Sequence, residues 1–201
     1  RIAWDIHYSD GAEDVTDVIE MGIYFYPKGQ EPKYRQHLIR MGKTGVGAID
    51  IPPNTVQLTE VYFPLRQAAR IESFQPHMHL RGKAMTLEAL LPTGQNVVLS
   101  HVSEFSFMWH SAYVYADHSA PLLPKGTIIK VKAWHDNTAS NKANPDPSVW
   151  VGYGGRTVDE MAHAWMNVFY LSDAEYQEWI AKRGGKPGIP ATANATQQQQ
   201  Q

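Results

Sequence analysis

The sequence contains no cysteine, and this absence removes several classes of protein from consideration. Without thiols the chain has no disulfide framework, no zinc ribbon and no cysteine nucleophile. It also has no apolar run close to the roughly 20 residues of a membrane span, and no signal-peptide stretch at its N-terminus. We therefore expect no transmembrane segment in this chain, and we expect any export signal to lie outside it.

An excess of charge of one sign is also missing. Lysine and arginine number 18 against 20 aspartates and glutamates, which gives a formal net charge of −2. A chain so close to neutral does not attract nucleic acid or anionic lipid by its overall charge, so we expect no nucleic-acid partner. Hydrophobic residues make up 43% of the 201 residues, enough to bury the core of one domain, or of a domain and part of another.

Short apolar segments separated by turn residues recur along the chain at the spacing of a sandwich or barrel. Ile129, Val131 and Ala133 alternate with Lys130 and Lys132, as in a strand with one buried face. The pattern predicts an all-β fold, a jelly-roll-like antiparallel β-sandwich. The expected strands cover residues 2–8, 21–26, 60–65, 70–75, 86–91, 97–102, 112–115, 128–134 and 164–171.

One short helix is expected near the C-terminus. Ser172 and Glu175 form a capping-box pattern, residues 173–182 begin acidic and end basic, and Gly184 follows as a stop signal. Residues 184–201 then have the Gly, Pro, Ala and Gln content of an extended tail without a core of its own. We expect a partner protein to hold this tail.

Two adjacent prolines at positions 52 and 53 predict a boundary, because proline interrupts strand pairing. The part before them is predicted to supply the closing strands of a first, incomplete β-sandwich. The predicted parts are residues 1–50, the linker 51–54, the more complete second sandwich 55–171, the helix region 172–183 and the tail 184–201.

The segment QPHMHLRGK at residues 75–83 contains a His-x-His pair. Side chains at i and i+2 of a strand share a face, so His77 and His79 can face one metal ion. Such a pair is more often hydrogen-bonded or solvated, and that alternative stays open. Met161 would add a thioether, and two imidazoles with a thioether suit copper better than magnesium or calcium. The predicted ligands of one copper ion are therefore His77, His79 and Met161.

These segments resemble the ascorbate-dependent type II copper monooxygenases, the family of peptidylglycine hydroxylating and dopamine β-monooxygenases with its bacterial branch. There the catalytic copper is held by a His-x-His pair and by the methionine of an Asp-Glu-Met segment, and His77, His79 and Met161 fall on those positions. The chain is also similar to bacterial members around PHMHLRGK, FMWHSAYVYA, LPKGT and HDNTASNKANPDP. The resemblance covers most of residues 1–171, mainly the C-terminal catalytic-copper domain, and implies an external reductant such as ascorbate.

The opening segment IAWDIHYSD is similar to the strand that carries one histidine of the family's second copper site, which transfers electrons. The resemblance makes His7 a vestigial ligand of that site, and a core or edge-strand histidine is the alternative. The other two ligands there are an adjacent His-His pair, and none of the nine histidines of this chain is adjacent to another. We therefore expect the electron-transfer site to be incomplete here.

Three positions around the expected copper differ from the peptide-amidating members of the family. Those members have an arginine two residues before the first copper histidine, and an asparagine and a tyrosine at +2 and +4 from the methionine. Here the positions are Gln75, His163 and Trp165. Glutamine cannot form the charged, forked pair that arginine makes with a carboxylate, so amidation of glycine-extended peptides is not expected. The three residues are expected to line a pocket, with His163 as an alternative extra ligand and core packing as the alternative for Trp165.

Two functions from different classes are consistent with this sequence. In the first, the chain is the catalytic-copper half of a monooxygenase that hydroxylates a C–H bond of a small organic substrate with O₂. In the second, it is a non-catalytic accessory or scaffold subunit of a larger periplasmic redox complex, soluble or membrane-bound. Either one implies a bacterial periplasmic or extracellular location. The sequence assigns no catalytic residue beyond the metal ligands.

Overall fold

The computed structural model describes residues 4, 6, 14, 16–185 and 187 of the chain. Contacts divide the chain into two units, Arg1–Lys33 and Tyr34–Gln201. The described residues of the first unit form no strand or helix, so the strand predicted at residues 21–26 is wrong. Its apolar residues are exposed, because β-propensity yields a strand only where a partner strand is present. Most of the predicted strand at residues 2–8, including His7, lies outside the described residues.

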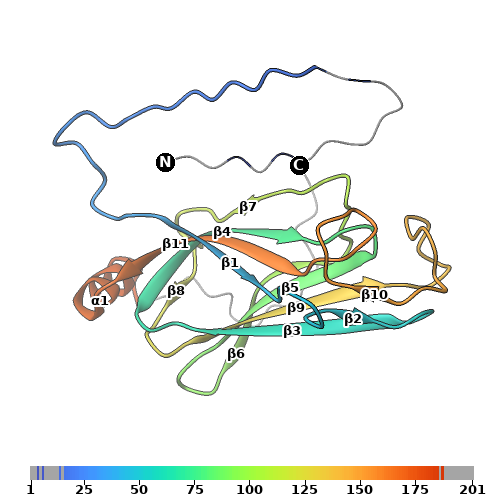
Figure 1. The fold of residues 1–201 in the computed structure, drawn as a ribbon. Helices are drawn as coiled ribbons and strands as arrows, with labels where there is room; N and C mark the ends of the chain where they lie inside the picture. Colours follow the sequence, from blue (N-terminus) through green and yellow to red (C-terminus); the bar gives the residue numbers. More distant parts are fainter. Residues whose placement is uncertain (1–3, 5, 7–13, 15, 186, 188–201) are drawn as a thin grey trace. The chain divides into compact units, whose positions relative to one another are not determined.

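The second unit contains two large antiparallel sheets, one above the other in Figure 1. One sheet has the order β1 (His37–Gly42), β11 (His163–Leu171), β4 (Ala68–His77) and β7 (Tyr113–Val114), with β8 (Leu122–Leu123) also paired to β4. The other has the order β3 (Val56–Pro64), β9 (Ile128–Asp136), β5 (Gly82–Leu90) and β6 (Asn96–Val102). A small third sheet pairs β2 (Asp50–Ile51) with β10 (Val151–Gly152). The prediction of a jelly-roll-like antiparallel β-sandwich is confirmed.

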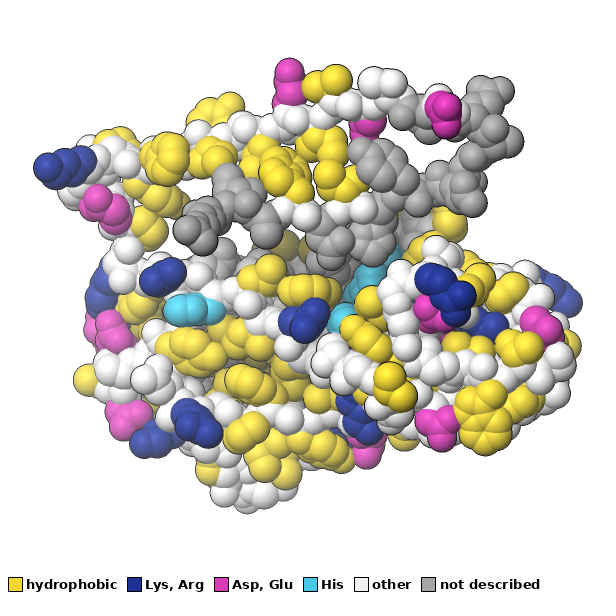
Figure 2. Space-filling view, in the orientation of Figure 1, with side chains coloured by type: hydrophobic (Ala, Val, Ile, Leu, Met, Phe, Trp, Pro, Cys, Tyr) yellow, Lys and Arg dark blue, Asp and Glu magenta, His cyan; other side chains and the backbone are white. Residues whose placement is uncertain are grey.

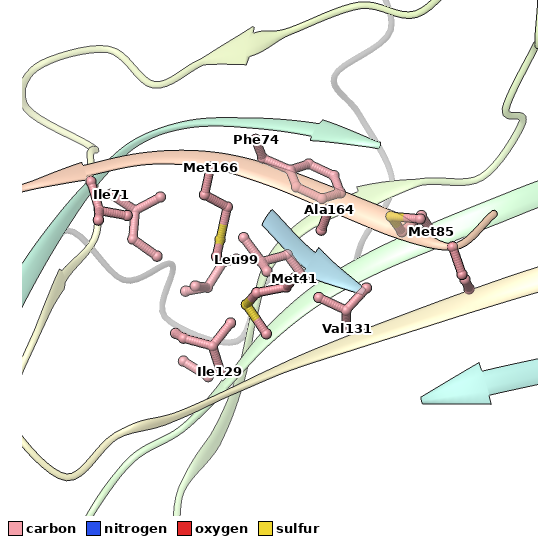
Figure 3. Close-up of a cluster of buried hydrophobic side chains, with 14 of the residues drawn as sticks. Met41, Ile71, Phe74, Met85, Leu99, Ile129, Val131, Ala164 and Met166 are labelled. Atoms are coloured by element: carbon pink, nitrogen blue, oxygen red, sulfur yellow. The ribbon is translucent and has the colours of Figure 1, made fainter. Parts of the chain in front are cut away.

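The hydrophobic core fills the space between the two large sheets (Figure 3). Phe74 of β4 and Met166 of β11 point into it from one side, and Met85 of β5 and Val131 of β9 from the other. All four side chains are almost completely buried. Because neighbouring residues of a strand face opposite ways, the alternate positions of β4 and β11 lie on the outer face of their sheet.

The chain between the first unit and the linker takes part in this sandwich. β1 pairs along its length with β11, and β2 pairs with β10. β1 and the first residue of β2 lie within residues 1–50, which the sequence assigns to a first sandwich. The assignment of domains stays a prediction for the chain as a whole.

The single predicted helix is confirmed as α1 (Asp173–Lys182). Ser172 and Glu175 form both hydrogen bonds of the capping box, and Gly184 follows the helix with a positive φ of 63°. Among the described residues no helix is both long enough and apolar enough to cross a membrane. Of the expected tail, Gly184, Gly185 and Pro187 are described, and the carbonyl of Pro187 accepts a hydrogen bond of 2.8 Å from the backbone N–H of Leu122.

Charged side chains of both signs are interspersed on the face of the molecule that Figure 2 shows, in keeping with the net charge of −2. A separate group of charged residues lies on β5 and β9, where Glu88 is buried and Lys130 and Lys132 are half-buried. Glu88 is 4% exposed, and its two carboxylate oxygens lie 2.8 Å from the ammonium groups of Lys130 and Lys132. Asn96 donates a further hydrogen bond of 3.0 Å. Burial alone raises the pKa of Glu88, but these hydrogen bonds outweigh it and lower the pKa to about 2.

We expect Glu88→Gln to destabilise the fold in a pH-dependent way. The folded pKa of Glu88 lies below its ordinary value of 4.5, so its stabilising effect is complete above that value and is lost as the pH falls toward 2. The difference in pKa corresponds to about 3 kcal/mol at pH 7. Urea unfolding should therefore show a loss of about 2–3 kcal/mol at pH 7 that shrinks by more than half at pH 3. The exposed Glu104 provides the matched control, since Glu104→Gln should change little at either pH.

Candidate metal centre

His77 and His79 lie close together where β4 ends. His77 is the last residue of the strand, and His79 begins the turn that leads to Gly82, whose N–H donates to the His79 carbonyl at 3.1 Å. Met78 between them is completely buried in the core. The side chains therefore keep alternating between the two faces of the sheet for two residues beyond the end of β4, so His77 and His79 lie on the same face. The centres of their imidazole rings are 5.4 Å apart, and the ring planes are at 86°.

The outer face of the β11–β4 pair brings the predicted lining residues beside His77. His163 is the cross-strand partner of His77, and Trp165 is the partner of Gln75. The rings of His77 and His163 are 5.9 Å apart and nearly parallel, at 19°. The rings of His163 and Trp165 are 6.4 Å apart. Residues from two distant segments therefore form one surface next to the His-x-His pair.

His163 is the most enclosed residue of this surface, at 2% exposure. A Cβ atom at Gly42 would lie only 2.2 Å from its Cδ2, so the glycine of β1 leaves the room that the imidazole occupies. Burial and the charge of Arg40 lower the pKa of His163 to about 4, against a smaller opposite effect of the Lys43 backbone. The imidazole is therefore neutral at physiological pH. A role for His163 as an extra ligand stays a prediction.

Glu160 connects the segment of Met161 to the segment of His79. Its carboxylate oxygen Oε2 accepts hydrogen bonds from the backbone N–H groups of His79 at 2.8 Å and of Met161 at 3.2 Å. The other oxygen, Oε1, accepts one from the backbone N–H of Arg81 at 2.6 Å. The side chain is fully buried. Two of the predicted ligand positions, far apart in the sequence, are thus fixed to a single carboxylate oxygen.

His135 fixes the same segment from its carbonyl side. Its Nε2 donates to the carbonyl oxygen of Met161 at 3.0 Å and lies 3.5 Å from Oε2 of Glu160. Burial lowers the pKa of His135 to about 4, so its ring is neutral at physiological pH. Burial also raises the pKa of Glu160 to about 7, although the three backbone N–H groups act in the opposite direction. Both polar backbone groups of Met161 are therefore held.

The hydrogen bonding of His79 determines which of its nitrogens can bind a metal. Its Nδ1 lies 3.0 Å from the backbone carbonyl oxygen of Asp159. A carbonyl oxygen only accepts, so Nδ1 carries the proton and Nε2 carries the lone pair. Metal-binding histidines commonly use this arrangement, in which one nitrogen donates to a carbonyl and the other binds the ion.

The donors predicted in this region are two imidazoles and a thioether. In the described part of the chain, no three side chains of the types His, Cys, Asp and Glu form a metal-binding group. The predicted third donor, the thioether of Met161, is of the kind that cuprous ion accepts, and the copper site stays a prediction. The nearby carboxylate of Glu160 is occupied by backbone N–H groups. The oxygen-rich set that magnesium or calcium prefers is not assembled from these residues.

Buried polar residues that the sequence analysis left without a role support this centre. Arg81 is 1% exposed, and its guanidinium donates to Asn137 Oδ1 at 2.9 Å and to the carbonyl of Val158 at 2.9 Å. Through the hydrogen bond to Val158, Arg81 holds in place the loop that precedes Glu160. His110, to which the sequence assigned no role, lies 3.2 Å from His77 between their Nδ1 atoms. These contacts are long-range, and no local spacing in the sequence indicates them.

Comparisons with known proteins add little on function. No family model and no curated protein matches the chain. Among solved structures, the chain is similar to a virus-like particle of the extra small virus of the giant freshwater prawn Macrobrachium rosenbergii, with 11% identity, a TM-score of 0.28, and coverage of 82% of this chain and 94% of that chain. It is also similar to a structure of infectious bursal disease virus, Gt strain, with 9% identity, a TM-score of 0.28, and coverage of 82% and 39%. At these values neither similarity bears on what the chain does.

Proposed function

We propose that the chain binds one copper ion through His77, His79 and Met161 and serves in the O₂-dependent hydroxylation of a C–H bond, as its resemblance to the type II copper monooxygenases implies. The observation that supports this most is the carboxylate of Glu160, which binds the backbone of His79 and the backbone of Met161 through one oxygen. Such a contact has no need of a metal, but it brings two of the three ligand positions together.

Each part of the chain has a defined task in this proposal. When bound, copper supplies one-electron redox chemistry and the activation of oxygen. His77 and His79 would provide imidazole nitrogens and Met161 would provide sulfur, while Glu160 and His135 hold the backbone of Met161 in place. An external reductant such as ascorbate would deliver the electrons.

The residues beside His77 suit a substrate without a carboxylate anchor. Gln75 donates its side-chain amide to the carbonyl of His110 at 3.2 Å, and it offers no positive charge. Trp165 presents an aromatic ring, with the guanidinium of Arg40 5.7 Å from the ring centre. We propose a small organic substrate that contacts the ring of Trp165 and has no carboxylate anchor at position 75.

Metal analysis of the purified chain tests this function first. After loading with copper and removal of loosely bound metal, we expect about one copper per chain, and oxygen consumption with ascorbate that yields a hydroxylated product. A chain that takes up no copper under these conditions would refute the proposal. A chain that binds copper, forms a stable complex with partner proteins and shows no turnover would instead support the alternative, a non-catalytic subunit of a redox complex.

A further inference from the structure

His110 contacts two residues on the outer face of β4 beside the candidate centre. Its Nδ1 lies 3.2 Å from Nδ1 of His77, and the two ring centres are 4.8 Å apart at an interplanar angle of 86°. Its backbone carbonyl accepts the hydrogen bond from Gln75, two residues before His77. Both the ring and the backbone of His110 are therefore tied to the same strand.

The loop that carries His110 is well defined by its own contacts. The N–H of Trp109 donates to the carbonyl of Ser106 at 3.0 Å, and the ring of His110 packs against Phe105 and Phe107 with ring centres 5.4 and 5.3 Å away. Just after the loop, Tyr113 of β7 pairs with Phe74 of β4. The position of His110 next to His77 thus follows from the pairing of β7 with β4.

Two imidazole Nδ1 atoms at 3.2 Å form one hydrogen bond, in which one ring donates and the other accepts. If His77 binds a metal through Nε2, its proton must be on Nδ1, and Nδ1 of His110 must accept it. His79 is in the same state, because its Nδ1 faces a carbonyl oxygen that only accepts. With His110 as acceptor, both histidines of the pair have the same tautomer and present Nε2 to the ion.

We infer that His110 is a positioning residue for His77: its Nδ1 accepts the Nδ1–H of His77, which fixes the ring and makes Nε2 the metal-binding nitrogen. This inference rests on the proposed copper site, but the hydrogen bond itself exists without metal. His110 would thus accept the Nδ1 proton of His77, just as the backbone carbonyl of Asp159 accepts the Nδ1 proton of His79. Loss of such a partner typically lowers metal affinity about 10- to 100-fold.

The tautomer of His77 tests the inference in the absence of metal. Long-range ¹H–¹⁵N NMR of metal-free protein with labelled histidine, recorded at pH 8 where imidazoles are neutral, should show His77 protonated at Nδ1. In His110→Ala this preference should disappear. In His110→Asn it should persist, because the amide oxygen of asparagine takes the place of Nδ1 and accepts the same proton. A His77 ring protonated at Nε2 in the wild type would overturn the inference.

Copper affinity, measured by competition with a chromophoric chelator, provides the second readout. We expect His110→Ala to weaken copper binding about 10- to 100-fold and His110→Asn to restore most of the loss. His118→Ala is the matched control, since His118 is exposed and its removal should leave the affinity unchanged. X-ray absorption should show the same number of nitrogen ligands in wild type and His110→Ala.

The outcomes separate this inference from the proposed function. A wild type that binds copper with an affinity insensitive to His110→Ala would remove the role of His110 and leave the copper site standing. Loss of one nitrogen ligand in His110→Ala would make His110 a ligand, which overturns the positioning role. A wild type that binds no copper, yet shows the Nδ1–H tautomer of His77, would support the hydrogen bond and refute the proposed function.

Discussion

Replacing both His77 and His79 with alanine is expected to abolish copper binding. The double variant removes two of the three proposed donors, and the thioether of Met161 alone is too weak a ligand to retain the ion. We expect the affinity to fall by more than about 100-fold, since even partners that only orient a ligand contribute 10- to 100-fold. Metal content after dialysis against a mild chelator is the measurement.

The double variant His101→Ala, His118→Ala is the matched control. Both residues are exposed, so this variant also loses two histidines but none of the proposed donors. It should retain about one copper per chain. If the two double variants bind the same amount of copper, the site does not exist.

Met161→Leu should affect the two oxidation states of copper differently. Sulfur favours the cuprous state, whereas imidazole accepts either state. We therefore expect the variant to lose affinity mainly for cuprous ion.

Copper should also dissociate below about pH 6 from the wild type, because protons compete with the metal for imidazole nitrogens.

The sequence predicted the elements whose signals are local. The helix α1 has the bounds expected from its capping residues, because the capping box and the glycine after the last turn act within a few residues. The strand β9 was likewise indicated by apolar residues that alternate with Lys130 and Lys132. The failed prediction at residues 21–26 shows the limit of such signals. Apolar alternation indicates what a segment can form, and a paired neighbour decides whether it forms.

The candidate centre was predictable only in part. His77, His79 and Met161 came from a motif, and the structure brings the backbone of Met161 to the backbone of His79. The role of Glu160 was missed although it directly precedes Met161, because a carboxylate in a motif gives no sign of which N–H groups it binds. His110 was missed because its approach to His77 depends on the pairing of β7 with β4.

Replacing Glu160 with glutamine is expected to damage the fold and the centre together. The carboxylate accepts three backbone hydrogen bonds, two on Oε2 and one on Oε1. An amide has one oxygen, so in either orientation its NH₂ group faces a buried backbone N–H. The NH₂ group and the backbone N–H are both donors, so neither has a hydrogen-bond partner. We expect this to lower the free energy of unfolding by about 2–4 kcal/mol. Urea unfolding at pH 5 measures the effect, because the raised pKa of about 7 leaves Glu160 uncharged in the folded wild type there, so the comparison with glutamine does not include the cost of burying a charge.

The same substitution should also weaken copper binding, because the backbone of Met161 would lose its shared anchor with His79. We expect a loss of about tenfold or more in affinity. Glu104→Gln, at an exposed carboxylate, is the control for both measurements and should leave both unchanged. A Glu160→Gln protein that unfolds at the wild-type urea concentration would contradict the hydrogen bonding described for this carboxylate. A protein that is destabilised as expected but binds copper with full affinity would show that the carboxylate supports the sandwich, and that the position of Met161 is fixed by other contacts such as the hydrogen bond from His135.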